Sequence, residues 1–223
     1  MDASSLVPTA ADRARWARYR EYLAFWEGRQ WHERARPGET RLVLNYARAL
    51  VRKVTSVLFS RPVRYSVPAS PAAERALAQL ASEDDWHGLD CAAALDAAVL
   101  GDAAFKVTWD AARQRPRLTT VDPAQLVVAT RPDDLREVVA VVHEYPLEAG
   151  AVEAVYGVAL PAVGPAGWVT VREEWTAERY RLSAGGVPLH DGANPYGWIP
   201  YVLVPNTPAP GGVWGESDLA DLL

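Results

Sequence analysis

The chain is poor in the residues and segments that assign a protein to a compartment. Cys91 is its single cysteine among 223 residues, so an intrachain disulfide cannot form and a cysteine-based zinc site has no support. No stretch comes near the ~20 consecutive apolar residues that a membrane-spanning helix needs. The first 16 residues lack the basic start and apolar run of a secretory signal. These absences predict a protein that folds in a reducing cytoplasm and has no membrane partner.

Motifs of catalysis and of cofactor binding are also missing. The sequence contains no HExxH pair, no GxSxG elbow and no GxxxxGK[ST] loop. The glycines of residues 211–215 do not have the spacing of a dinucleotide-binding fingerprint. The histidines lie far apart in sequence and belong to no Cys/His cluster: they are His32, His87, His143 and His190. We therefore expect no enzyme, no cofactor and no metal site.

Three short polar pairs remain as candidates for chemistry. Asp84-Asp85 and Glu173-Glu174 are of the residue type that binds a divalent cation or acts as acid and base. Adjacent carboxylates point in different directions on a strand, however, and such pairs are usually solvated surface. His190-Asp191 has no matching nucleophile. We favour a structural role for all three, and we expect Cys91 to be a small buried residue of a helix.

Charge is distributed unevenly along the chain, although the net charge is only −5. Residues 1–64 contain 13 basic and 6 acidic side chains, whereas residues 65–223 contain 10 basic and 22 acidic ones. This polarity indicates a nucleic-acid-binding face, or a basic part of one subunit that packs on an acidic part of the next. Arginines that merely solvate helix faces are an equally good reading of charge alone.

The first helix is expected between a capping box at Thr9–Asp12 and a stop at Gly28. Its apolar side chains recur every three or four residues, at Trp16, Tyr19, Leu23 and Trp26. Arginines are interleaved with these aromatics, which is a pattern of single-stranded nucleic-acid platforms. Because the aromatics keep helical spacing, we favour a core stripe flanked by arginine stems.

A second helix is expected from about Leu42 to Phe59, ended by Arg61-Pro62. Alternation then predicts a half-buried strand over 63–67. On the helix, Arg48, Arg52 and Lys53 are expected to face away from one broad apolar stripe, which consists of Tyr46, Ala49, Leu50, Val54, Val57 and Leu58.

Two further helices and a series of strands complete the predicted α+β fold, in which helices precede a mainly antiparallel β region. The helices cover 71–81, opened by Ser70-Pro71, and 90–100, ended by Gly101. One hairpin is expected from 104–109 and 117–121, and a second from 125–129 and 138–145. The remaining strands are expected at 152–158, 168–175, 179–182 and 198–204.

Several short segments occur in an informative order. Residues 19–28 form an expected aromatic helix that ends at a glycine. In residues 44–65, a helix that starts at Asn45-Tyr46 leads to a short turn and a strand that begins at Pro62. A helix–Gly101–strand step and an Asp122-Pro123 turn come next. Pro200 lies in 194–202, and 214–219 contains Gly215, Glu216, Ser217 and Asp218. In this order, from about residue 16 to the end, the chain resembles the N-terminal wing portion of siphophage portal proteins, the head–tail connectors of tailed bacteriophages.

The resemblance implies a portal-wing fold with a helical part at 1–101, a β-rich part at 102–214 and the start of a stem helix at 215–223. It implies a full-length protein that forms a dodecameric ring at one capsid vertex, through which double-stranded DNA is packaged and ejected. Its partners would be other copies of itself, the capsid and scaffolding protein, the large terminase and the head–tail adaptor. The protein would reside in the virion after assembly in the bacterial host cytoplasm. The resemblance implies no catalytic residues, because ATP hydrolysis belongs to the terminase.

The basic residues around the second helix are the candidate subunit or capsid contact. We hypothesise that they meet the acidic β-rich half of an adjacent subunit, or the capsid; a solvent-facing basic surface is the alternative. The rival class of function is a nucleic-acid-binding module that uses the basic-aromatic N-terminal helices, and an enzyme of unrecognised type is third. The candidate contact residues are Arg48, Arg52, Lys53, Arg61 and Arg64.

Overall fold

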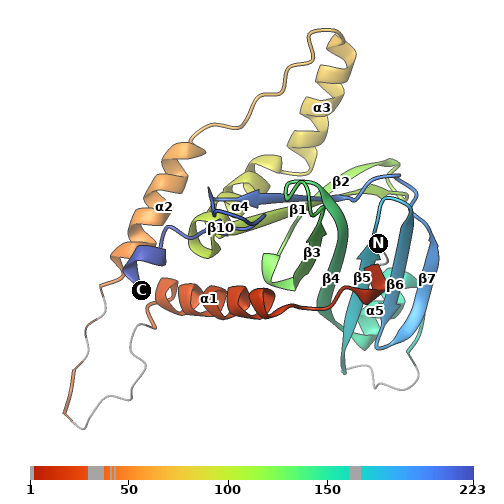
Figure 1. Cartoon of the computed structure of the whole chain (residues 1–223). Helices are drawn as coiled ribbons and strands as arrows, with labels where there is room; N and C mark the ends of the chain where they lie inside the picture. Colours follow the sequence, from red (N-terminus) through yellow and green to blue (C-terminus); the bar gives the residue numbers. More distant parts are fainter. Residues whose placement is uncertain (1–2, 30–37, 41, 43, 161–166) are drawn as a thin grey trace. The chain divides into compact units, whose positions relative to one another are not determined.

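The computed structural model describes residues 3–29, 38–40, 42, 44–160 and 167–223. Helices dominate its first hundred residues, and antiparallel strands dominate the remainder (Figure 1). Helix accounts for 36% and strand for 30%, so the predicted α+β class is confirmed. The chain divides into two units: Met1–Arg13 with Asp122–Tyr201, and Ala14–Val121 with Val202–Leu223. No helix in the described ranges is long and apolar enough to cross a membrane.

Helix α1 (Ala10–Trp26) begins and ends as its sequence predicts. The Thr9 N–H donates to Asp12 Oδ2 at 2.9 Å, and the Asp12 N–H donates to Thr9 Oγ1 at 3.1 Å, which is a reciprocal capping box. At the other end Gly28 adopts a φ of +83°. The Arg29 N–H then reaches the Ala24 carbonyl at 2.8 Å, which closes the helix in a Schellman motif.

The buried stripe of α1 is rotated from the one expected. Tyr19 and Trp26 are buried as predicted, but Leu23 is 40% exposed, and the expected burial of Leu23 is therefore wrong. Arg15 and Tyr22 are buried instead, which gives the spacing 15, 19, 22 and 26 along one helix face. The aromatic rings of this face contribute to the core, in agreement with the favoured interpretation.

Three more helices follow in the second unit: α2 (Tyr46–Leu58), α3 (Pro71–Glu83) and α4 (Trp86–Leu100). The Ser70 hydroxyl accepts the Ala73 N–H at 3.2 Å, and Pro71 occupies the first turn of α3, as expected of this cap. Gly101 ends α4 with a φ of +94°. Both predicted boundaries are confirmed.

The strand expected over 63–67 is absent, and this prediction is wrong. These residues lie in an extended segment between α2 and α3 that joins no sheet. The Val67 N–H donates to the side chain of Glu74 on α3 at 2.9 Å. This backbone donor, which would pair with a neighbouring strand in a sheet, is thus satisfied by a side chain. An alternating pattern therefore produced extended backbone without strand pairing.

A three-stranded sheet in the order β2-β1-β8 packs beside α4. Strands β1 (Asp102–Asp110) and β2 (Arg115–Val121) form the first predicted hairpin, with Val107 opposite Leu118. Strand β8 (Tyr201–Pro205) corresponds to the strand predicted over 198–204. Small side chains of α4, Ala93 and Ala97, are buried with Ala103, so the helix approaches the sheet closely.

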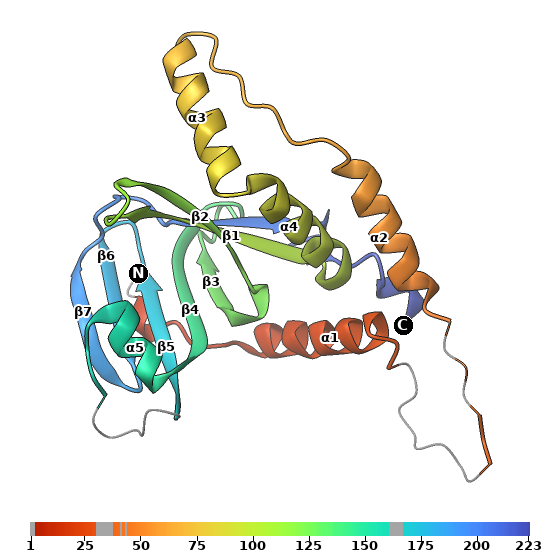
Figure 2. The same cartoon turned by 180° about the vertical axis from the view of Figure 1, so that it is seen from behind.

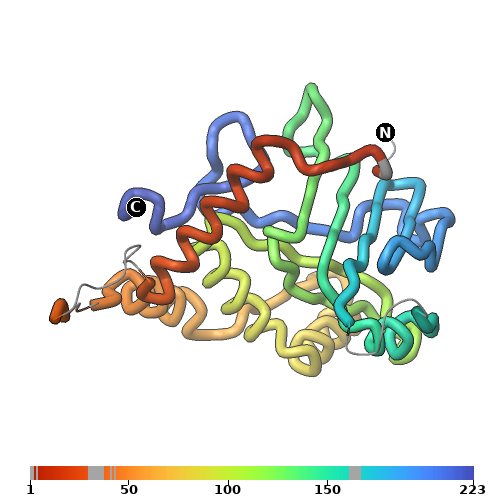
Figure 3. Tube along the Cα trace, turned by 90° about the horizontal axis from the view of Figure 1, so that it is seen from below, coloured from red at the N-terminus to blue at the C-terminus, as the bar shows by residue number. Residues whose placement is uncertain are grey.

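The first unit contains a five-stranded antiparallel sheet in sequence order (Figure 2). Its second predicted hairpin is confirmed, and β7 is a strand that the sequence analysis did not anticipate. The 3-10 turn η1 (Ala3–Ser5) lies beside β4 and β5 (Figure 3). The strands are β3 (Leu126–Thr130), β4 (Val138–Glu148), β5 (Trp168–Trp175), β6 (Arg179–Ala184) and β7 (Val187–Ala193).

Residues 152–158 do not form the predicted strand, because helix α5 (Ala149–Tyr156) occupies most of that segment. Val152 is fully buried against the sheet and Gly157 ends the helix in the left-handed region. The apolar spacing of Val152, Val155 and Tyr156 is helical, and a short apolar run does not decide between the two structures. The core here also contains Leu160, Val169, Val171, Leu182 and Ala184.

The last residues form short pieces: β9 (Thr207–Pro208) pairs with β10 (Gly215–Glu216), and the 3-10 turn η3 covers Ala220–Leu222. A stem helix that starts within 215–223 stays a prediction. The domain limits expected at residues 101 and 214 also stay a prediction.

Candidate assembly surface

Helix α2 is fixed at its first residue by a side chain from the resemblance motif. The Asn45 side-chain oxygen accepts the Arg48 N–H at 2.9 Å and so caps the helix. The amide nitrogen of the same side chain donates to the Trp26 carbonyl at the end of α1, at 2.7 Å. One asparagine therefore satisfies a free donor of α2 and a free acceptor of α1, which explains an Asn at this position.

One face of α2 is apolar and exposed. The helix packs against α4, yet Val51 is its only described residue that is buried (Figure 1). The helix also carries large apolar side chains that are exposed to solvent, and we call this set the α2 face. Its members are Tyr46 (74% exposed), Leu50 (65%), Val54 (55%), Val57 (60%) and Leu58 (68%).

The predicted stripe is thus real, but Lys53 borders it and does not lie elsewhere. Lys53 comes three residues after Leu50 and four before Val57, and residues at these spacings share a helix face. It is exposed, and no carboxylate of the described ranges pairs with it. The α2 face is therefore an apolar surface with Lys53 at its edge.

The other candidate contact residues do not form one patch with Lys53. The guanidinium groups of Arg48 and Arg52 lie 5.5 and 5.8 Å from the centroid of the Trp26 ring, close enough for cation–π attraction. Arg61 and Arg64 are exposed in the extended segment after α2. Arg48 and Arg52 thus lie over the Trp26 ring, although Arg52 is exposed like the other three basic residues.

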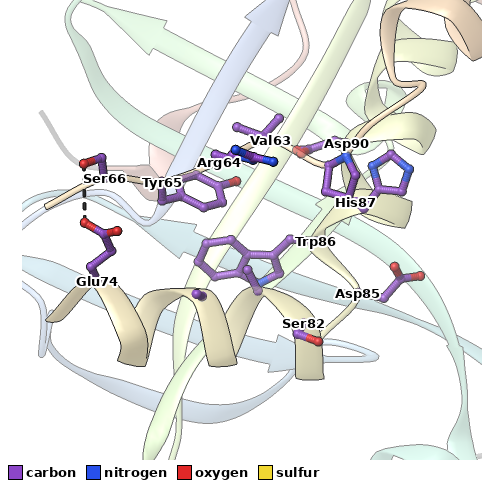
Figure 4. Close-up of a pocket in the computed structure, with 13 residues that line it drawn as sticks. Val63, Arg64, Tyr65, Ser66, Glu74, Ser82, Asp85, Trp86, His87 and Asp90 are labelled. Carbon is purple, nitrogen blue, oxygen red and sulfur yellow. Dashed lines mark hydrogen bonds between the residues drawn. The ribbon is translucent and has the colours of Figure 1, made fainter. Parts of the chain in front are cut away.

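A groove lies between that extended segment and the helices α3 and α4 (Figure 4). Its volume is about 660 Å³, and two of its lining residues, Tyr65 and Trp86, meet edge-on with ring centroids 5.5 Å apart. The Trp86 Nε1 and His87 Nδ1 atoms are buried without a hydrogen-bond partner in the described part of the chain. Burial raises the pKa of the Asp90 carboxyl at the rim, and the neighbouring His87 opposes this effect.

The motif residues Gly101 and Gly215–Asp218 meet in space. The Gly215 N–H donates to Asp102 Oδ1 at 2.7 Å, and the Asp218 N–H donates to the Ala98 carbonyl at 2.9 Å. A Cβ on Gly101 would lie 2.7 Å from the Ser217 nitrogen, and one on Gly215 would lie 2.5 Å from the Gly101 oxygen. Both glycines are required because the backbones are in contact. Sequence order did not predict this junction.

Asp102 links the same junction to α1. The Tyr19 hydroxyl donates to Asp102 Oδ2, and the Arg15 guanidinium donates to the Tyr19 oxygen at 3.2 Å. Arg15 also stacks over Trp214, 3.7 Å from the ring centroid. Burial raises the pKa of Asp102, although the hydrogen bonds from Tyr19 and Gly215 favour its ionised form.

The remaining motif residues have local structural roles. Asp122 caps the 3-10 turn η2 (Pro123–Gln125) by accepting the Ala124 N–H at 2.8 Å, and Pro123 occupies its first position. Pro200 is fully buried and directly precedes β8. Pro62 lines the groove.

The acidic pairs are accounted for by structural contacts. Asp84 pairs with Arg115 at 2.5 Å, whereas Asp85 caps α4 through the Gly88 N–H at 3.1 Å. Glu174 pairs with Arg172 at 2.7 Å on one side of β5, and Glu173 is buried on the other. Adjacent carboxylates thus point in different directions, as expected.

Buried Glu173 is surrounded by hydrogen-bond donors. It accepts from Trp175 Nε1 at 2.9 Å, from the Tyr145 hydroxyl at 3.1 Å and from the Tyr201 hydroxyl at 3.3 Å. His143 contacts the same Tyr201 hydroxyl at 3.0 Å. His32 lies outside the described residues, within which no group of histidine, cysteine and acidic side chains is arranged to bind a metal ion.

Comparison with known proteins identifies the family. A family model described as "Phage portal protein, SPP1 Gp6-like" matches residues 16–157, which is more than half of the chain. The chain therefore belongs to the SPP1 Gp6-like phage portal proteins, and the match lies in its N-terminal portion. No curated protein matches the chain. The matched residues include the whole of α2 and its exposed face.

Proposed function

We propose that this chain is a subunit of the ring at the capsid portal vertex, through which double-stranded DNA is packaged and later ejected. The observation that carries the proposal is the family match over residues 16–157. Portal proteins are structural, and the family implies self-assembly and association with the capsid. The large terminase, the scaffolding protein and the head–tail adaptor are the further partners proposed for the complete protein.

The described surfaces support a mechanical and electrostatic role. A ring of identical subunits needs two different surfaces on each subunit, because the contact between neighbours is heterologous. Lys53, Arg61 and Arg64 are exposed, and residues 65–223 have an excess of acidic side chains. We propose that these three cations meet the acidic surface of a neighbouring subunit or the capsid, while Arg48 and Arg52 support the end of α1.

The alternative is a nucleic-acid-binding module that uses the basic-aromatic N-terminal helices. Base stacking by such a module requires aromatic rings that are free. In α1 the rings of Tyr19, Tyr22 and Trp26 are buried, which does not favour this reading.

Loss of the protein during infection tests the proposed function directly. A phage carrying a conditional stop codon in this gene, grown without suppression, should form capsids without packaged DNA and without attached tails. Expression of the protein in trans should restore both. DNA-filled, tailed particles that lack the protein would contradict the proposal. Immunogold labelling of wild-type particles should mark one vertex only, and label spread over the whole capsid would count against it.

A further inference from the structure

We propose that the α2 face docks on a second copy of this chain and is the hydrophobic centre of the contact between neighbouring subunits. The inference rests on the proposed function, since the ring consists of copies of one chain. It goes beyond that function by naming the side chains that enter the contact. These are Tyr46, Leu50, Val54, Val57 and Leu58, with Lys53 at their edge.

The size of the exposed surface is the first argument. Five large apolar side chains on one side of a short helix, each more than half exposed, present on the order of 500 Å² of apolar surface. The largest apolar patch on a soluble monomer is typically of this size and is often functional. A standard protein–protein contact buries roughly 800 Å² on each partner, so the α2 face would supply much of one side.

Contacts within its own unit already hold α2 in place. Val51 is buried, the helix packs on α4, and Asn45 attaches its first turn to the end of α1. The apolar residues of the α2 face are therefore not required to hold the helix in position. A stiff helix with a preformed apolar face loses little conformational entropy on docking.

Charge indicates the partner. Lys53 borders the apolar face and has no acidic partner in the described ranges. Arg61 follows three residues after the helix ends. A surface that docks here must bring a carboxylate to Lys53, because burial of an unpaired charge is costly. Residues 65–223 of the same chain supply 22 acidic against 10 basic side chains.

The position of Lys53 also decides the type of contact. Lys53 is close to the middle of α2 (Tyr46–Leu58), so two α2 faces packed on each other about a two-fold axis would bring two lysines together. Repulsion between the two lysine charges opposes such a dimer. The α2 face therefore meets a different, acidic surface of the second copy, which is the heterologous geometry that closes a ring.

Cysteine protection identifies the occupant of the α2 face. Cys91 is replaced by Ser, and Val54→Cys or Ser56→Cys is introduced into this background; Ser56 is exposed on the same helix outside the face. The rate of maleimide alkylation is followed over a range of protein concentrations, and assembly is monitored by native mass spectrometry. We expect the Val54→Cys rate to fall at least tenfold as assemblies form, with the Ser56→Cys rate unchanged.

Three results would overturn the inference. Protection of Val54→Cys that is independent of concentration would show that another segment of the same chain covers the face. Undiminished alkylation within visible rings would remove the α2 face from the contact, although the portal function would stand. Undiminished alkylation with no assembly at any concentration would show that copies of this chain do not dock there. DNA-filled particles in the infection experiment would instead contradict the proposed function itself.

A pair of aspartate substitutions tests the same face by energetics. Leu50→Asp places a charge in the proposed contact, whereas Val155→Asp changes an equally exposed apolar residue on α5 (65% and 63% exposed). Leu50→Asp should weaken self-association at least tenfold, and Val155→Asp should leave it unchanged. Circular dichroism and thermal unfolding establish that both variants fold. Equal association of Leu50→Asp and the wild type would contradict the proposal.

Discussion

The buried carboxyl of Asp102 makes the stability of the Gly101–Asp218 junction depend on pH. Burial raises its pKa in the folded chain above the ordinary value near 4. The folded state then binds a proton more tightly than the unfolded state does. Its contribution to stability is greatest below the unfolded pKa and is lost as pH rises through the folded pKa.

Asp102→Asn removes this titration while it retains an oxygen that can accept the Gly215 N–H. The free energy of unfolding of the variant, relative to the wild type, should rise as pH increases from below 4 towards neutrality. Urea unfolding at a series of pH values measures the difference. A difference that is constant over this range would show that Asp102 does not titrate differently in the folded chain.

Gly101→Ala tests the close backbone contact at the same junction. The new methyl group would lie 2.7 Å from the Ser217 nitrogen at a residue with φ of +94°, so strain and overlap act together. We expect a loss of about 3 kcal/mol. Gly157→Ala is the matched control, since φ is +72° and no atom lies within 4 Å of its Cβ position; it should lose only ~1 kcal/mol. Equal losses would exclude the steric contribution.

The start of α2 depends on Asn45 more than an ordinary helix start depends on its cap. Asn45→Ala removes the cap of α2 and the hydrogen bond to the Trp26 carbonyl, so about 2 kcal/mol should be lost. Ser70→Ala removes only the cap of α3 and should cost ~1 kcal/mol. Hydrogen exchange should report faster opening of the first turn of α2 only in the Asn45 variant. Indistinguishable losses in the two variants would mean that the link to α1 contributes nothing.

Local signals made several elements predictable from the sequence. The Thr9–Asp12 capping box and the stop signals Gly28 and Gly101 act through neighbouring residues. The helix boundaries that they set therefore do not depend on the rest of the fold. The 63–67 strand failed because a strand needs a partner that alternation does not specify. The short apolar segment of α5 fits a strand or a helix until its packing is known.

The exposed apolar face was only half predictable. Periodicity grouped Tyr46, Leu50 and Val54 on one stripe, but it cannot reveal that α2 packs against α4 and buries Val51 instead. Lys53 was assigned to another face although it stands three residues from Leu50. The meeting of Gly101 with Gly215 could not be predicted either, because no local rule joins residues more than a hundred positions apart.

Assembly of the complete ring should respond to charge at Lys53 and Arg52 in different ways. Lys53→Glu reverses the cation at the edge of the α2 face and should weaken assembly, most strongly at low salt, without a change in thermal stability. Arg52→Glu should lower thermal stability as well, because the guanidinium lies 5.8 Å from the centroid of the Trp26 ring. Native mass and melting temperature measured on both variants separate the two roles. Unchanged assembly of the Lys53→Glu variant would show that the charge of Lys53 does not contribute to the contact.

The native mass of the chain, measured over a range of protein concentrations and combined with electron microscopy of the large species, tests the central claim most directly. We predict that the wild type forms closed rings of identical subunits, that Leu50→Asp prevents their formation, and that Val155→Asp does not. A wild type that stays monomeric at every concentration, or rings that form equally well with Leu50→Asp, would contradict assembly through the α2 face.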